Sequence, residues 1–128
     1  MTYFISGHRN ITSEEFVEHY LPQIFNVIKE DPNAKFVVGD YDGVDSIAQQ
    51  LLINKTKNLT VYHMFDKPMN NHGNWDTKGG YKDDIDRDSA MTKESDKDIA
   101  WIRTPGDMSG TEQNIERRKK FNENKNTI

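Results

Sequence analysis

The hydrophobic positions of this 128-residue chain follow two alternating patterns. Short runs rich in β-forming residues, two of them ending at a glycine, predict buried strands. Between these runs, apolar residues recur at intervals of three and four, which predicts helices. The predicted strands are 2–7, 34–39, 59–64 and 98–102. The predicted helices are 11–30, 43–56, 83–93 and 109–124.

The segment 11–30 carries the strongest helix signals. Thr12 is the expected N-cap, and Glu15 three residues later completes a capping box. Apolar residues from Phe16 onward fall on one stripe of the helix. Pro22 lacks a backbone donor, so we expect it to kink the helix or divide it.

The segment 65–82 is the least regular part of the pattern. Its proline, asparagines and glycines oppose a long regular element, which predicts a long loop that is either functional or mobile. Trp75 and Tyr81 lie in this loop and could close over a base by stacking; plain surface disorder is the alternative. A frayed tail is expected from about residue 122.

The order of these elements predicts an α/β fold. Helices separate the strands, and the connections are too long for hairpins, so parallel pairing with right-handed crossovers is expected. Residues 1–128 are therefore interpreted as a single Rossmann-like three-layer domain, with a parallel sheet of about four to five strands flanked by helices. Ligands of such folds bind beyond the carboxyl ends of the strands.

Composition narrows the classes of partner. The formal net charge of −4 and the pI near 5.5 disfavour duplex nucleic acid and single-stranded DNA. No cysteine is present, and the histidines and aspartates of 63–76 match no ligand spacing, so no metal site and no cofactor are predicted. No apolar run approaches the length of a membrane span or a signal sequence, and the expected location is the cytoplasm.

The turn "PGDMSGTEQN" before the last helix is a candidate anion site. Ser109, Gly110 and Thr111 bring two hydroxyls and an unhindered backbone to a helix N-terminus, where free amides and the helix dipole favour negative charge. The alternative is that Ser109 or Thr111 is an ordinary N-cap.

The turn "GDYDGVD" after the second strand is a weaker candidate. Gly39 and Gly43 permit backbone conformations that direct amides at a ligand, and a helix follows. Asp40, Asp42 and Asp45 oppose a phosphate here, so ribose hydroxyls or a capping role suit them better. As a bare pattern, a purely structural turn is the favoured interpretation.

Two arginines are candidate clamps for an anion at these turns. Arg9 follows Gly7 and His8 at the end of the first strand, and Arg87 lies in the helix 83–93. A guanidinium forms paired hydrogen bonds with phosphate or carboxylate. For Arg87 the alternative is an ion pair with neighbouring aspartates, and for His8 it is a structural hydrogen bond. The basic cluster 116–120 is interpreted as a solvated helix face.

An ordered set of motifs resembles the SLOG superfamily. The motifs are "ISGHR", "GDYDGVDSIA", "RDSAM" and "SGTEQNI", each at the expected end of a strand, and together they span Phe4 to Ile115. The superfamily includes the lonely-guy phosphoribohydrolases, DprA-like and YspA-like proteins, and relatives of the nucleoside deoxyribosyltransferases. The resemblance implies a nucleotide or nucleotide-derived ligand, and a homo-oligomer, either a dimer or a tetramer.

The resemblance also implies roles for individual residues. Gly39, Asp40, Gly43, Asp45 and Ala48 match the turn that touches the nucleotide, with Asp40 where a second glycine is usual. Arg87 and Met91 match the arginine-methionine segment. Ser109, Gly110 and Thr111 match the phosphate-binding loop.

One departure bears on catalysis. The glutamate of the phosphoribohydrolases falls on Asn114, which cannot take up a proton. Glu112 is two residues away, a rotation of about 200° on a helix, so it is expected to face elsewhere.

Two functional hypotheses follow. The first is a module that binds a nucleotide-derived ligand as a sensor or by sequestration, with Asn114 hydrogen-bonded to a ribose hydroxyl or a base edge. The alternative is an enzyme acting at the N-glycosidic bond, a phosphoribohydrolase or a deoxyribosyltransferase-like protein. Its candidate carboxylates are Glu112, Asp45 and Asp88, of which Glu112 and Asp88 are the predicted catalytic residues.

Overall fold

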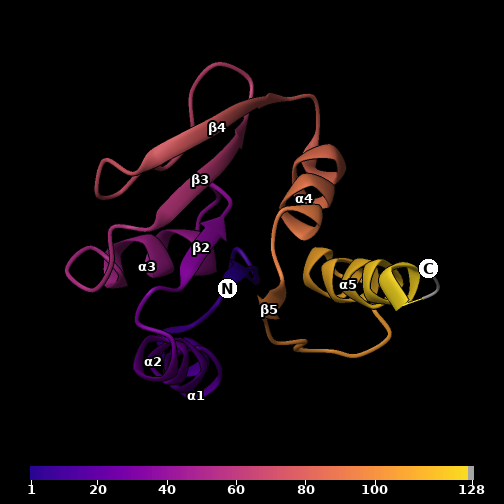
Figure 1. Ribbon diagram of the computed structural model, residues 1–128, viewed down its shortest axis with the longest axis horizontal. Helices are drawn as coiled ribbons and strands as arrows, with labels where there is room; N and C mark the ends of the chain where they lie inside the picture. The colour runs from indigo at the N-terminus through magenta and orange to yellow at the C-terminus, as the bar shows by residue number, and fades with distance from the viewer. Residues whose placement is uncertain (127–128) are drawn as a thin grey trace.

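A five-stranded parallel sheet forms the centre of the molecule (Figure 1). The computed structural model describes residues 1–126. The strand order is β4-β3-β2-β1-β5. The strands are β1 (Thr2–Ile5), β2 (Lys35–Val38), β3 (Leu59–Met64), β4 (Asp76–Tyr81) and β5 (Lys97–Ile99). The helices are α1 (Ser13–His19), α2 (Leu21–Glu30), α3 (Val44–Leu51), α4 (Asp84–Lys93) and α5 (Gly110–Asn126). The predicted α/β class and parallel pairing are confirmed.

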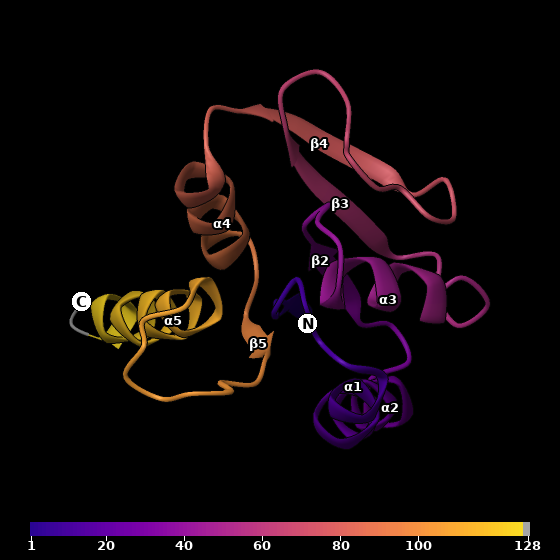
Figure 2. The same ribbon diagram turned by 180° about the vertical axis from the view of Figure 1, so that it is seen from behind.

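Helices cover both faces of the sheet and give the predicted three layers. Helices α1, α2 and α3 lie on one side of the strands, and α4 and α5 lie on the other, in front and rear views alike (Figures 1 and 2). Successive strand residues point to opposite faces. Ile5 accordingly packs in the core beneath α1–α3, while Phe4 packs with Met91 of α4.

The first predicted helix is divided into two. Thr12 accepts the Glu15 N–H at 3.1 Å and donates its own N–H to the Glu15 carboxylate at 3.0 Å, which confirms the capping box. The helix breaks at Tyr20, and Pro22 lies in the first turn of α2, where its missing N–H costs least. The buried Tyr20 hydroxyl donates to the Ser6 carbonyl at 2.8 Å and so anchors the end of β1.

The segment predicted as a long loop, 65–82, contains the edge strand β4. All β4 residues except Tyr81 are exposed, so the strand carries no hydrophobic signal. Its glycines lie at an irregularity of the pairing, between the pairs Tyr62–Lys78 and Met64–Tyr81, and a β-carbon at Gly79 would collide with the His63 ring of β3. Tyr81 stacks on Tyr62 of β3.

The two ends of the C-terminal region also differ from the prediction. Strand β5 stops at Ile99, three residues before the predicted end. Helix α5 continues through Asn126, so the tail predicted to fray from about 122 is helical as far as the described residues reach. Within residues 1–126, no helix has the length and apolar composition needed to cross a membrane.

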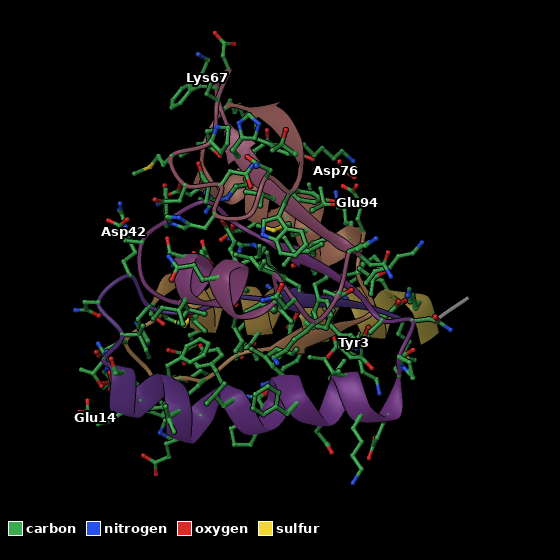
Figure 3. The ribbon with its side chains drawn as sticks, turned by 90° about the vertical axis from the view of Figure 1, so that its left-hand side faces the viewer. Tyr3, Glu14, Asp42, Lys67, Asp76 and Glu94 are labelled. Atoms are coloured by element: carbon green, nitrogen blue, oxygen red, sulfur yellow. The ribbon has the colours of Figure 1, made fainter. Side chains whose placement is uncertain are left out.

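All five strands run in the same direction, so their carboxyl ends lie together along one side of the sheet, called here its carboxyl edge. Figure 3 shows Tyr3, Asp76 and Glu94 at one edge, where β1 and β4 begin and α4 ends. Asp42, which follows β2, and Glu14 of α1 lie at the opposite edge. The strand-to-helix turns therefore gather at the edge that carries Asp42.

Candidate functional site: a polar cavity at the carboxyl edge of the sheet

A cavity of about 630 Å³ opens at the carboxyl edge of the sheet, on the face covered by α4 and α5. Four segments line it: the end of β1 with its loop, the β2–α3 turn, α4, and the first two turns of α5. Pockets of this size hold small molecules and cofactors. The predicted site residues that line it are Gly7, His8, Arg9, Gly39, Asp45, Arg87, Asp88, Met91, Gly110, Thr111 and Asn114.

Four other predicted site residues do not line the cavity. These are Asp40, Gly43, Ser109 and Glu112. Asp40 is almost completely buried and accepts the Met69 N–H at 2.8 Å. Trp75 packs against the core under α1–α3, so neither it nor Tyr81 lines the cavity, and the expected closure over a base has no support in their placement.

Arg87 lines the cavity but is paired with carboxylates. Its Nη1 donates to Asp40 at 2.9 Å and its Nε donates to Asp88 at 3.2 Å. Its Nη2 lies 3.9 Å from Asp84, and its guanidinium lies 4.4 Å from the centre of the Tyr41 ring. Only 3% of Arg87 is exposed. The alternative considered from the sequence, an ion pair with nearby aspartates, is confirmed.

Asp45 supplies a buried carboxyl to the cavity. It lies in the first turn of α3 and accepts the Tyr41 N–H at 3.2 Å. Burial raises its pKa to about 7, although the Arg87 charge acts to lower it. A carboxyl with this pKa exchanges protons near neutral pH, the property required of a general acid or base.

Asp88 is the second carboxyl of the cavity. Besides Arg87, its partner is Asn114 of α5, whose Nδ2 donates to it at 3.1 Å. Burial raises its pKa, and Arg87 and Asn114 act in the opposite direction. Asn114 therefore stands where the resemblance expects a glutamate, and it binds a carboxylate that a glutamate would repel. Its Oδ1 accepts from Arg117.

Gly43 shapes the cavity without lining it. Its φ is +79°, and a β-carbon would lie 2.3 Å from the His8 carbonyl oxygen. The next residue, Val44, donates its N–H to the same carbonyl at 3.3 Å. Glycine is required here because it lets the loop that carries His8 and Arg9 pack against the start of α3.

The structure confirms the N-cap interpretation of the Ser-Gly-Thr turn, and the anion site stays a prediction. Ser109 Oγ accepts the Glu112 N–H at 3.2 Å, an N-cap bond. The Glu112 carboxylate accepts the N–H groups of Gly106 and Met108 at 3.0 and 2.9 Å, so it closes its own loop and faces away from the cavity, as the helical rotation predicts. Gly110 and Thr111 line the cavity.

Sequence reasoning missed Ser6, Tyr41 and Arg117, which also line the cavity. Arg117 follows Asn114 by three residues on the same helix face, so helical periodicity from Asn114 could have found it. The interpretation of 116–120 as a solvated face is wrong for two residues: Arg117 faces the cavity, and the buried Arg118 pairs with Asp98 at 3.1 Å.

Two buried polar atoms near the cavity have no protein partner among the described residues. They are Ser6 Oγ and His8 Nε2. Burial, followed by the charge of Arg103, lowers the pKa of His8, so its ring is neutral at pH 7. Buried polar groups are nearly always hydrogen-bonded, so each of these atoms is available to a bound molecule or water.

Neither a metal centre nor a relative identifies the site. Across residues 1–126, no group of three or more acidic or histidine side chains could hold a metal ion. Comparisons with protein-family models, curated proteins and solved structures found no match to this chain.

Proposed function

We propose that this protein binds a nucleotide or nucleotide-derived small molecule in the cavity at the carboxyl edge of its sheet. The observation that carries the proposal is the convergence of four segments on one cavity that combines cationic donors with buried carboxyls. Arginines and the N-terminus of α5 suit a phosphate. Asp45 and Asp88 suit the hydroxyl groups of a sugar, because a carboxylate accepts hydrogen bonds.

The role that we favour is a sensor or a sequestering module. Asp88 is held by Arg87 and Asn114, which fixes it for recognition and blunts its reactivity. The resemblance to the SLOG superfamily supports the same ligand class. It also supports a homo-oligomer, for which light scattering of the purified protein is the test.

An N-glycosidic bond enzyme is the second candidate, and the placement of Asp45 favours it. Cleavage of that bond builds positive charge on the sugar and requires a proton at the leaving base. Asp45 is a buried cavity carboxyl with a pKa of about 7, and Asp88 is a second carboxyl in the same wall. In this hypothesis Asp45 handles the proton and Asp88 stabilises the sugar cation.

The test begins with the purified protein. Copurified small molecules are released by denaturation and identified by mass spectrometry, and nucleosides and their 5′-monophosphates are then titrated by calorimetry. Binding of at least one nucleotide is expected. Failure of every nucleoside and nucleotide to bind would refute the proposal.

A second assay separates the two roles. Each bound compound is incubated with the protein, and free base is measured by chromatography, with and without a second base as acceptor. A sensor releases no base. Base release that disappears in Asp45→Asn would establish the enzyme instead.

A further inference from the structure

The five arginines of the chain divide into two groups. Arg87, Arg103 and Arg118 each form an ion pair with a carboxylate. Arg9 and Arg117 form none with any residue that the structure describes, and both line the cavity. No carboxylate of the described residues lies within 4.0 Å of either guanidinium, and the charge of Arg117 acts on Asp88 from a longer distance.

The contacts of Arg9 leave its donors open. Arg9 lies in the exposed loop after β1, and its guanidinium rests 4.1 Å from the centre of the Tyr41 ring. The Arg87 guanidinium lies 4.4 Å from the centre of the same ring. A stacked guanidinium keeps the N–H groups at its edge free for hydrogen bonds.

Arg117 is similarly open on α5. Its Nη1 donates to the Asn114 amide oxygen, and no other hydrogen bond to a described residue involves its guanidinium. Gly110, Asn114 and Arg117 lie at intervals of four and three residues, so they share the helix face that lines the cavity. The N-terminus of α5, which is the positive end of the helix dipole, lies at Gly110 in the cavity wall.

Arg87 already donates hydrogen bonds to two carboxylates. An anion that engaged Arg87 would compete with Asp40, which is buried, and with Asp88, which is partly buried; both lie within 3.2 Å of its guanidinium nitrogens. It would also bring further negative charge next to them. The ligand's anionic group is better placed where cationic donors lack such partners.

We propose that Arg9 and Arg117 hold the anionic group of the ligand and make the cavity selective for a phosphate monoester over the matching uncharged nucleoside. Arg87 is a positioning residue that fixes Asp40 and Asp88. This inference rests on the proposed function, because it concerns the same cavity and the same ligand class.

The test compares Arg9→Gln and Arg117→Gln with the wild-type protein by calorimetry. The probes are adenosine, guanosine, cytidine and thymidine, their 5′-monophosphates, and inorganic phosphate. The wild type is expected to prefer at least one monophosphate over its nucleoside by at least tenfold. Each variant is expected to reduce that preference at least fivefold while leaving nucleoside affinity within twofold. Arg→Lys at either position should restore part of the preference, since it restores the charge without the planar donor edge.

Matched controls remove the same charge elsewhere. The control variants are Lys120→Gln and Lys67→Gln. Lys120 lies on α5 and Lys67 lies on the loop after β3; both side chains are exposed and neither lines the cavity. Neither change is expected to alter the preference by more than twofold. A urea unfolding curve for each variant checks that it is folded.

The outcomes separate the two proposals. A wild type that binds no nucleoside and no monophosphate overturns both. A wild type that binds monophosphates, with variants that keep the full preference, overturns the assignment of Arg9 and Arg117 alone. An equal loss of nucleoside and monophosphate affinity would show a structural role and would also overturn it.

Discussion

Arg87 donates from Nη1 to Asp40 Oδ1 at 2.9 Å, and the two side chains are only 4% and 3% exposed. The pair joins α4 to the turn after β2, two segments that both border the cavity. A buried ion pair contributes little net stability as a pair, but removal of one partner leaves an uncompensated charge. Substitution of Arg87 is therefore expected to lower the free energy of unfolding before it changes ligand affinity.

The substitution Arg87→Met keeps the length of the side chain and removes its charge. We expect the free energy of unfolding to fall by about 3–5 kcal/mol, because Asp40 and Asp88 lose their cationic partner in a buried setting. Urea denaturation measures the change. Arg9→Met is the control, since Arg9 contacts no described carboxylate, and it should cost less than about 1 kcal/mol. Equal stabilities for the two variants would contradict the positioning role.

Asp45 should make stability depend on pH. Burial raises its pKa from 3.8 to about 7. Well below pH 3.8 the carboxyl is protonated in both the folded and the unfolded chain, and it contributes no difference. Between pH 4 and pH 7 the unfolded chain releases the proton while the folded protein keeps it, so the free energy of unfolding falls as pH rises. Above pH 7 the penalty is constant, on the order of 4 kcal/mol at 1.36 kcal/mol for each pH unit.

Asp45→Asn should remove that decline. The stability difference between the variant and the wild type is expected to shift in favour of the variant from pH 4 to pH 7 and then to level off. Urea midpoints at half-unit pH intervals measure it. Asp42→Asn, at an exposed position of the same turn, is the matched control for the loss of a carboxyl group. A difference for Asp45→Asn that does not change with pH would show that its carboxyl keeps an ordinary pKa.

Gly43→Ala tests the contact between the β1 loop and α3. The φ of +79° alone makes alanine unfavourable by about 1–3 kcal/mol, and the β-carbon would also meet the His8 carbonyl. We expect a loss of at least that size in urea, with weaker ligand binding because the loop that carries Arg9 must move. Gly110→Ala is the control for stability: its β-carbon meets nothing within 4 Å, so alanine there should be neutral or stabilising. An unaltered stability in Gly43→Ala would mean that the loop rearranges freely.

The core of the fold could be predicted because buried positions recur as apolar residues at regular intervals in the sequence. Phe4 and Ile5 point to opposite faces, and α1–α3 repeat apolar residues at helical spacing. Strand β4 shows no such periodic pattern of apolar residues. It is a solvent-exposed edge strand whose pairing depends on the fit between Gly79 and the His63 ring, a tertiary contact that no local pattern encodes.

The position of the candidate site in the fold could be predicted from the sequence, but the contacts of its side chains could not. The carboxyl-edge rule brought Gly7, Asp45 and Thr111 to one cavity. Spacing alone could not tell whether Arg87 would face a ligand or Asp40, because these two residues are 47 positions apart in the sequence and meet only in the folded chain. Arg117 was missed because the basic cluster was interpreted as one solvated surface, whereas a helix turns its residues by 100° each.

Glu112 is expected to stabilise the loop before α5 and to take no part in the cavity. Its carboxylate accepts the N–H groups of Gly106 and Met108, and its own N–H is capped by Ser109. Glu112→Gln keeps the shape but loses the charge that strengthens these bonds, so we expect a fall of about 1–2 kcal/mol in the free energy of unfolding.

Ligand affinity and any base release should stay unchanged in Glu112→Gln, because the side chain faces away from the cavity. Glu116→Gln, four residues farther along α5, is the matched control: it removes the same charge from an exposed pair with Lys119 and should cost less than about 0.5 kcal/mol. Urea curves, calorimetry and the base-release assay are run on all three proteins. The opposite result would be a Glu112→Gln protein that has wild-type stability but no longer binds or cleaves. That result would show that this glutamate acts in the site and that the loop 106–112 rearranges when ligand binds.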